Sequence, residues 1–260
     1  MRLHHEIRGD GPPVLLVHAG IADSRMWEPL AERLVAAGRR VVAPDLRGFG
    51  RSPLPPETFS PAADLLELLD DLGIERAPVV GASFGGRVTL ELALRAPGRV
   101  SAIALLDSVL DEFDPSVELE AFDEAETAAA EAGDLDEATA INVRMWLDRP
   151  GRTGVDPQAR DLVAAMTRRA FEAQDGVDAA FEELDPPVAR RLGEIRCPAL
   201  VVVGEDDVED FHRLAARLAD ELPEAGPVVV IPGAAHLPAL ERPAEVADVL
   251  LPFLRHHAAG

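Results

Sequence analysis

The stretch that most constrains this chain lies at residues 79–86, where a strand-like run turns directly into a helix-like pattern. The apolar pair Val79-Val80 is followed by Gly-x-Ser-x-Gly at residues 81–85. Ser83 therefore lies on a tight turn, and Gly81 and Gly85 relieve the steric crowding that a strained serine backbone creates. The hydroxyl is then exposed at the end of a strand, above the free N–H groups and positive dipole of the next helix. This pattern favours a nucleophilic serine with an oxyanion site beside it, although a solvated serine in a tight turn would look the same.

Short apolar runs recur along the chain and predict a parallel sheet that is buried on both faces. They lie at residues 14–17, 41–43, 79–80, 103–106, 200–203 and 228–231, with a short edge strand expected at 3–7. Helix-period segments separate most of them, at 27–38, 58–72, 84–95, 208–222 and 243–255. Strands alternating with helices indicate an α/β fold with a mostly parallel central sheet and helices on both faces.

One long segment, residues 111–196, breaks this alternation because it contains no strand-like run. It is rich in Ala, Glu and Asp, and between Asp111 and Glu137 it carries 12 carboxylates and no basic residue. We interpret it as a helical insertion that leaves the carboxyl edge of the sheet, where α/β folds bind ligands. The expected organisation is a core of residues 1–110 and 197–260 with a cap or lid at 111–196.

A serine nucleophile needs a base within hydrogen-bond reach and an acid that orients the base. The candidate base is His236, which follows the run at 228–231 by a loop of small residues and precedes the last helix. The candidate acids are Asp206 and Asp207, directly after the run at 200–203. Asp107, at the end of the run at 103–106, remains a further candidate, although a turn or helix-cap role fits it as well.

An oxyanion site also needs two backbone donors. The N–H of Phe84, the residue after the nucleophile, is the first candidate. The loop after the run at 14–17 supplies the second, and we assign it to Gly20. His18 in that loop is expected to shape the loop through hydrogen bonds rather than to act as a second base.

With these residues in place, the chain resembles the α/β-hydrolase superfamily of serine hydrolases over nearly its whole length. The further matching segments are Val17-His18-Ala19-Gly20, Ser24-Arg25-Met26-Trp27, Asp45-Leu46-Arg47-Gly48-Phe49-Gly50-Arg51-Ser52, Ala96-Pro97-Gly98-Arg99-Val100 and Ile195-Arg196-Cys197-Pro198. The resemblance implies the catalytic triad Ser83, Asp207 and His236, because it places the acid three residues after Gly204. It also makes Cys197 a structural residue. Ala19 departs from the glycine usual in the oxyanion loop, and its methyl group limits the backbone conformations of that loop.

The resemblance further implies that the insertion is a cap that roofs the substrate site. Candidate residues that line the substrate pocket are Trp27, Met145, Trp146, Phe171 and Phe181. The expected activity is hydrolysis of a small, largely apolar ester, thioester or lactone, with no metal and no organic cofactor. The alternatives on this scaffold are a C–C bond hydrolase of vinylogous diketones, a cofactor-free haloperoxidase or perhydrolase, and a non-catalytic ligand receptor. A dehalogenase or epoxide hydrolase with an aspartate nucleophile is disfavoured, because position 83 is serine.

Charge and composition exclude several other classes of function. The formal net charge is −22 and the sequence contains no lysine, so binding to nucleic acid or to an anionic membrane surface is not expected. No apolar run is long enough for a transmembrane helix, and the N-terminus lacks the apolar segment of a secretory signal. The single cysteine, Cys197, fits a reducing cytoplasm. We therefore expect a cytoplasmic monomer or homodimer whose partner is a small-molecule substrate.

Overall fold

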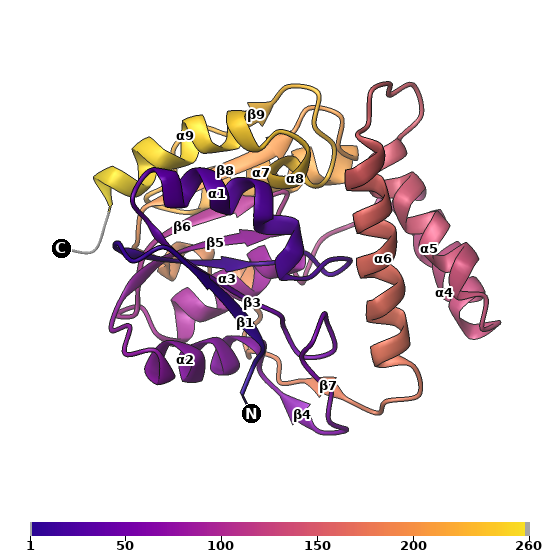
Figure 1. Ribbon diagram of the computed structural model, residues 1–260, viewed down its shortest axis with the longest axis horizontal. Helices are drawn as coiled ribbons and strands as arrows, with labels where there is room; N and C mark the ends of the chain where they lie inside the picture. Colours follow the sequence, from indigo (N-terminus) through magenta and orange to yellow (C-terminus); the bar gives the residue numbers. More distant parts are fainter. Residues whose placement is uncertain (1, 258–260) are drawn as a thin grey trace.

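The computed structural model describes residues 2–257 and is built around a sheet of seven strands (Figure 1). Their spatial order is β1-β3-β2-β5-β6-β8-β9. Their bounds are β1 His5–Arg8, β2 Pro13–Val17, β3 Arg40–Pro44, β5 Ala77–Ala82, β6 Val100–Leu106, β8 Ala199–Gly204 and β9 Val229–Ile231. Each strand predicted from an apolar run is present, with shifts of a few residues at its ends.

The sheet is parallel except at one edge, where β1 pairs antiparallel with β3. At its centre β5 lies between β2 and β6, with Leu16 opposite Val80 and Ala82 opposite Leu106. Every residue of β5 and β6 is buried. A strand covered on both faces has no solvent side for polar residues, which explains why these runs are apolar throughout. The predicted fold class is confirmed.

Helices cover both faces of the sheet (Figure 1). α1 (Glu28–Ala36) and α9 (Pro243–His256) pack together on one face, and α2 (Pro61–Asp71) and α3 (Phe84–Arg95) pack together on the other. α7 (Glu209–Glu221) follows β8, and the short helix α8 (Pro238–Glu241) precedes α9.

One predicted helix, at residues 58–72, begins later than expected. The Ser60 hydroxyl accepts a hydrogen bond from the Ala63 N–H at 3.2 Å, and Pro61 occupies the first helical turn, so the helix starts at residue 61. Thr58 and Phe59 instead form the short strand β4.

Between β6 and β8 the chain forms a separate group of helices at one end of the molecule (Figure 1). The group contains α4 (Val117–Glu131), α5 (Leu135–Val143), the π-helical turn η2 (Arg144–Asp148) and α6 (Pro157–Gln174). The expectation that residues 111–196 lack a strand is wrong at one place, because Ala180–Phe181 forms β7 and pairs with β4. Two residues are too few to show an apolar run, so this pairing has no signature in the sequence.

The division into a core of residues 1–110 and 197–260 and a cap of residues 111–196 stays a prediction. Residues 1 and 258–260, which the predicted core includes, lie outside the described part. Within residues 2–257, no helix combines the length and the apolar character that a membrane span needs.

Candidate active site

Ser83 occupies a sharp turn between β5 and α3. Its backbone has φ 50° and ψ −116°, a conformation that residues other than glycine rarely adopt. A side-chain Cβ at position 81 would lie 2.3 Å from the Gly85 carbonyl oxygen, and one at position 85 would lie 2.2 Å from the Val17 carbonyl oxygen. Only glycine fits at either place, because the obstructing atoms belong to the backbone. The two glycines therefore allow the turn on which Ser83 lies.

Asp207 and His236 form a buried pair at the same edge of the sheet. Asp207 follows β8, His236 follows β9, and a carboxylate oxygen of Asp207 (Oδ2) lies 2.8 Å from Nδ1 of His236. The side chains are 0% and 2% exposed, respectively. Burial opposes ionisation of Asp207, but the adjacent imidazole and the hydrogen bonds outweigh burial and lower the pKa of this carboxyl.

Asp206, the other candidate acid in this loop, turns away from His236. Its carboxylate accepts a hydrogen bond from Nε of Arg152 at 3.0 Å, and its side chain is 38% exposed. Of these two adjacent aspartates, Asp207 alone is hydrogen-bonded to His236 in the described structure.

Ser83 is linked to this pair through the end of β6. The Ser83 N–H donates to the carbonyl oxygen of Leu106 at 2.9 Å. The next residue, Asp107, has a carboxylate oxygen within 4.8 Å of both the Asp207 carboxylate and a ring nitrogen of His236. Within residues 2–257, no direct hydrogen bond joins Ser83 to His236. The structure thus brings the acid and the base into contact and locates the serine at the end of β5, two strands from β8 along the same edge.

Gly20 and Phe84, the candidate oxyanion donors, lie next to each other. A Cβ built on Gly20 would be 3.4 Å from the Cβ of Phe84. In the described chain neither backbone N–H donates to a protein acceptor, so both remain free for a ligand. His18 shapes this loop, because its Nδ1 lies 2.8 Å from the Ala19 carbonyl oxygen and its Nε2 accepts from the Leu46 N–H at 2.9 Å.

Aromatic rings lie against His236 and against Phe84, the residue after the serine. Trp146 and Phe211 each lie with ring centroids 4.3 Å from the His236 ring, and the Trp146 carbonyl oxygen accepts the His236 N–H at 3.2 Å. Near the serine, the ring centroid of Phe181, on β7, lies 5.4 Å from the ring centroid of Phe84. Residues from the segment between β6 and β8 therefore contact both the base and the residue after the serine.

Two further predicted pocket residues, Met145 and Phe171, lie on η2 and α6. Met145 is buried in η2, with its sulfur 3.8 Å from a guanidinium nitrogen of Arg149. Phe171 is partly buried on α6, and no ring contact involves it among the described residues.

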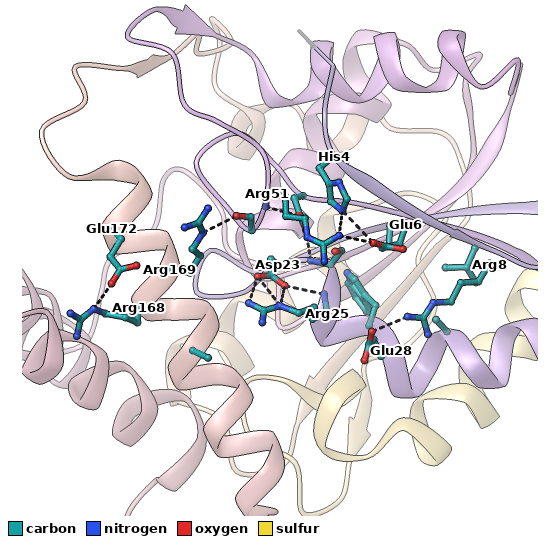
Figure 2. Close-up of a pocket in the computed structure, with 18 residues that line it drawn as sticks. His4, Glu6, Arg8, Asp23, Arg25, Glu28, Arg51, Arg168, Arg169 and Glu172 are labelled. Carbon is teal, nitrogen blue, oxygen red and sulfur yellow. Dashed lines mark hydrogen bonds and ion pairs between the residues drawn. The ribbon is translucent and has the colours of Figure 1, made fainter.

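Trp27 lies away from Ser83 and His236. It lines a cavity of about 550 Å³ between the N-terminal strands and α6 (Figure 2). It is fully buried, and none of Ser83, Phe84 and His236 borders this cavity. Charged side chains of both signs line the cavity, in ion pairs such as Arg25–Asp23, Arg8–Glu28 and Arg168–Glu172.

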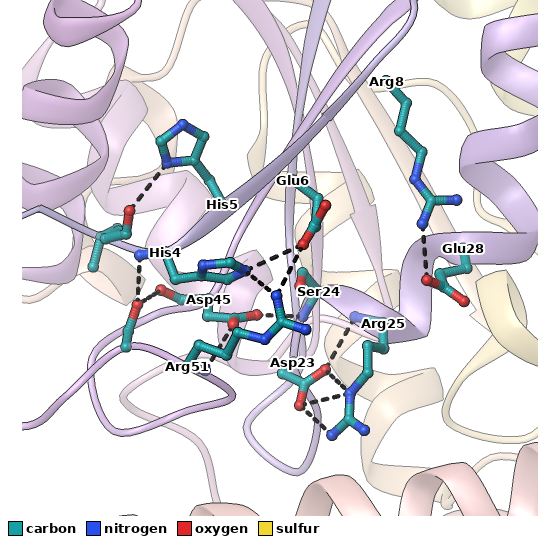
Figure 3. A network of polar contacts seen from close by, with 12 residues as sticks. His4, His5, Glu6, Arg8, Asp23, Ser24, Arg25, Glu28, Asp45 and Arg51 are labelled. Atoms are coloured by element: carbon teal, nitrogen blue, oxygen red, sulfur yellow. Dashed lines mark hydrogen bonds and ion pairs between the residues drawn. The ribbon is translucent and has the colours of Figure 1, made fainter.

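A polar network beside this cavity fixes the turn after β3 (Figure 3). The Asp45 carboxylate accepts hydrogen bonds from the Ser24 N–H and the Arg51 N–H, each at 2.8 Å. Asp45 therefore joins the turn after β3 to the segment around Ser24 that precedes α1.

Glu241 and Arg152 hold the loop that carries His236, a function that sequence reasoning missed. One Glu241 carboxylate oxygen accepts from the Ala235 N–H at 3.0 Å and from the Leu237 N–H at 3.2 Å. The other oxygen lies 2.7 Å from a guanidinium nitrogen of Arg152, and the two side chains are 4% and 7% exposed. Burial raises the pKa of Glu241, and the Arg152 charge works against that rise. Arg152 lies 89 positions from Glu241, so no local pattern could reveal the pair.

The described residues contain one cluster whose donor atoms are close enough to share a metal ion, and it consists of Asp107, Asp207 and His236. Asp207 and His236 already satisfy each other in it, as an acid and a base would. The donor set needs no ion to explain its geometry, and we assign none.

Comparisons with known proteins agree with this architecture. Residues 14–249 match the profile of the "Alpha/beta hydrolase family". The chain is 30% identical over 282 residues to "Putative carbamate hydrolase RutD" of Variovorax paradoxus (strain S110), across 100% of this chain and 98% of that protein. It is 27% identical over 309 residues to "Epoxide hydrolase 2" of Siraitia grosvenorii, across 98% of this chain and 95% of that protein.

Among solved structures, a thermophilic esterase from Thermogutta terrifontis superposes with a TM-score of 0.79. That esterase is 27% identical, and the alignment covers 99% of this chain and 94% of the esterase. The profile match spans most of the chain, and the strand order and the serine turn agree with it. The chain belongs to the alpha/beta hydrolase family and is a hydrolase.

Proposed function

We propose that this hydrolase cleaves a small, largely apolar carboxylic ester, thioester or lactone through an acyl-enzyme on Ser83. The observation that carries the proposal is the buried 2.8 Å contact between Asp207 and His236 at the edge of the sheet where Ser83 lies. A carboxylate can only accept, so Nδ1 of His236 carries a proton, and in the neutral ring Nε2 keeps its lone pair. This is the tautomer that a general base for a serine hydroxyl requires.

In the proposed reaction, His236 takes the hydroxyl proton of Ser83 as the oxygen attacks the substrate carbonyl. The N–H groups of Phe84 and Gly20 stabilise the tetrahedral oxyanion, and the positive end of the α3 dipole adds to them. The protonated His236 then gives its proton to the leaving group, and the acyl group remains on Ser83. Water, activated by the same histidine, adds to the acyl carbonyl and releases the acid and the free serine.

The surroundings of the site support an apolar substrate. Phe84 follows the serine and packs against Phe181, and Trp146 and Phe211 lie against the base. The similar esterase of T. terrifontis also favours ester chemistry. The epoxide hydrolase relative points to another reaction, but an epoxide hydrolase of the aspartate-nucleophile type would need a carboxylate where this chain has Ser83.

Hydrolysis of nitrophenyl esters of increasing acyl length, with several lactones beside them, tests the proposal. We expect turnover of esters with short apolar chains, and in Ser83→Ala a loss on the order of 10⁴-fold or more. If the wild-type protein hydrolyses none of these compounds, C–C bond hydrolysis or peroxidase chemistry replaces the proposal. If Ser83→Ala keeps the wild-type rate, Ser83 is not the nucleophile.

A further inference from the structure

Asp107 is a buried carboxyl group behind the Asp207–His236 pair, and the proposed reaction does not use it directly. It follows β6 and is 0% exposed. Its Oδ1 accepts a hydrogen bond from the Gly204 N–H at 2.8 Å. Its Oδ2 is buried and, if Asp107 is ionised, finds no donor among the described residues. An unsatisfied carboxylate oxygen in the interior is costly, so this atom needs an explanation.

The groups that face Asp107 make a second negative charge there unfavourable. Oxygen atoms of Asp107 and Asp207 and a ring nitrogen of His236 all lie within 4.8 Å of one another. Glu241 of α8 adds another carboxylate nearby, and its countercharge is Arg152, which pairs with Glu241 and Asp206 rather than with Asp107. Two buried carboxylates at this separation do not both stay ionised, and they bind each other only when one carries a proton.

The hydrogen bonds decide which carboxyl carries that proton. Asp207 accepts from the His236 ring and, at 2.7 Å, from the Val208 N–H, so both of its oxygens have donors. Among residues 2–257, Asp107 has the single donor Gly204. In agreement with this geometry, burial and then the charge of Asp207 raise the pKa of Asp107 well above its usual range.

We propose that Asp107 is a positioning residue that stays protonated at neutral pH and donates its Oδ2–H to the Asp207 carboxylate. This bond fixes the Asp207 side chain, and Asp207 in turn orients His236. The proton also leaves a single negative charge facing the imidazole. The catalytic consequence rests on the proposed function, whereas the protonation of Asp107 does not.

Two substitutions separate a protonated donor from an ionised acid. Asp107→Asn keeps a neutral hydrogen-bond donor, and Asp107→Gly removes the side chain. Both residues tolerate the φ of 45° at this position, so neither is expected to strain the turn.

Thermal melting as a function of pH tests the protonation without using activity. When folding raises the pKa of a carboxyl group, the free energy of unfolding falls as the pH increases from the unfolded-state pKa to the folded-state pKa. Asp107→Asn removes this loss of stability. At pH 8 the melting temperature of the variant should therefore be no lower than that of the wild type, and up to about 2–6 °C higher. The difference should shrink toward pH 4. If Asp107→Asn instead melts lower than the wild type, and increasingly so as the pH rises, then Asp107 is ionised and the proposal is wrong.

The pH profile of kcat/KM, with an ester that the wild type hydrolyses, tests the positioning role. Asp107→Gly should lower kcat about 10- to 100-fold with little change in KM, and Asp107→Asn should restore most of that loss. The midpoint of the acidic limb should be the same in Asp107→Asn and the wild type, because both carry a neutral group. A fall of this midpoint in Asp107→Asn, with a rate as low as in Asp107→Gly, would show that the charge of Asp107 is what matters. If Ser83→Ala proves fully active, the proposed function fails, and the melting experiment still decides whether Asp107 is protonated.

Discussion

Within the described chain, Ser83 and Asp107 are the residues other than glycine whose φ lies in the left-handed region, at 50° and 45°. Both immediately follow central strands, β5 and β6, at the edge of the sheet where Asp207 and His236 meet. A backbone strained in this way persists only where surrounding packing enforces it, and such residues cluster at functional sites. The strain therefore marks the same place as the buried acid–base pair.

The two adjacent aspartates after β8 should respond very differently to the loss of their charge. Asp207→Asn removes the acceptor that holds the Nδ1 proton of His236, so we expect kcat to fall about 10³- to 10⁴-fold. Asp206→Asn removes the charge of a 38% exposed carboxylate, and Arg152 keeps its bond to Glu241, so kcat should change less than about threefold. The ester assay measures both. A crippled Asp206→Asn with an active Asp207→Asn would contradict the assignment.

The glycine after the nucleophilic turn should tolerate no side chain. In Gly85→Ala the new methyl group would lie 2.2 Å and 2.5 Å from the carbonyl oxygens of Val17 and His18, which cannot move without disturbing β2. We expect a loss of about 3 kcal/mol or more in the free energy of unfolding. Gly98→Ala is the matched control, because nothing lies within 4 Å of its added Cβ. Denaturant unfolding of both variants provides the measurement, and equal stability of the two would refute this view of the turn.

At the scale of elements, the loop after β9 depends on contacts from outside itself. Glu241 of α8 accepts the N–H groups on either side of His236, and Arg152, from the segment between η2 and α6, neutralises Glu241. The segment between β6 and β8 thus contributes to the rigidity of the loop that carries the base as well as to its surroundings.

Removal of Arg152 tests this dependence. In Arg152→Ala the buried Glu241 carboxylate loses its countercharge, so we expect the free energy of unfolding to fall by about 3 kcal/mol. Ester hydrolysis should weaken as well, because the His236 loop loosens. Arg160→Ala is the control within the same group of helices, since Arg160 pairs with Asp148 at a largely exposed site and should cost less than about 1 kcal/mol. Equal losses in the two variants would show that the Arg152–Glu241 pair does not stabilise the loop.

At the scale of the whole molecule, the sequence predicts the sheet well because burial on both faces imposes apolar runs that are visible locally. The serine turn is equally visible, since its glycines are required by close backbone contacts. The choice of Asp207 over Asp206 came from resemblance alone, because two adjacent aspartates share the same local pattern and only tertiary packing separates them.

Other features depend on contacts between distant segments and have no local signal. The β4–β7 pairing joins two strands of two residues each. Arg152 and Glu241, which form an ion pair, are 89 positions apart in the sequence. Trp27 illustrates the same limit, because an aromatic residue at the start of a helix can face either the nucleophile or another cavity. Phe211 could have been suspected, as it lies in the first turns of the helix that follows the acid.

Cys197 should be nearly inert in the folded protein. Burial raises the pKa of its thiol to about 11, so little thiolate exists at pH 8. We expect alkylation by iodoacetamide at pH 8 to be at least about tenfold slower in the native than in the denatured protein, where the thiol has its ordinary pKa. Mass spectrometry over time measures both rates. Equally fast alkylation of the native protein would contradict the burial of this thiol.

The central claim, that Ser83 is a nucleophile activated by His236, is tested most directly by a fluorophosphonate probe with the modified residue identified by peptide mass spectrometry. We expect covalent labelling of the wild-type protein at Ser83, no labelling of Ser83→Ala, and labelling of His236→Ala that is slower by about 10³-fold or more. An unlabelled wild-type protein, or labelling that proceeds unchanged in either variant, would contradict it.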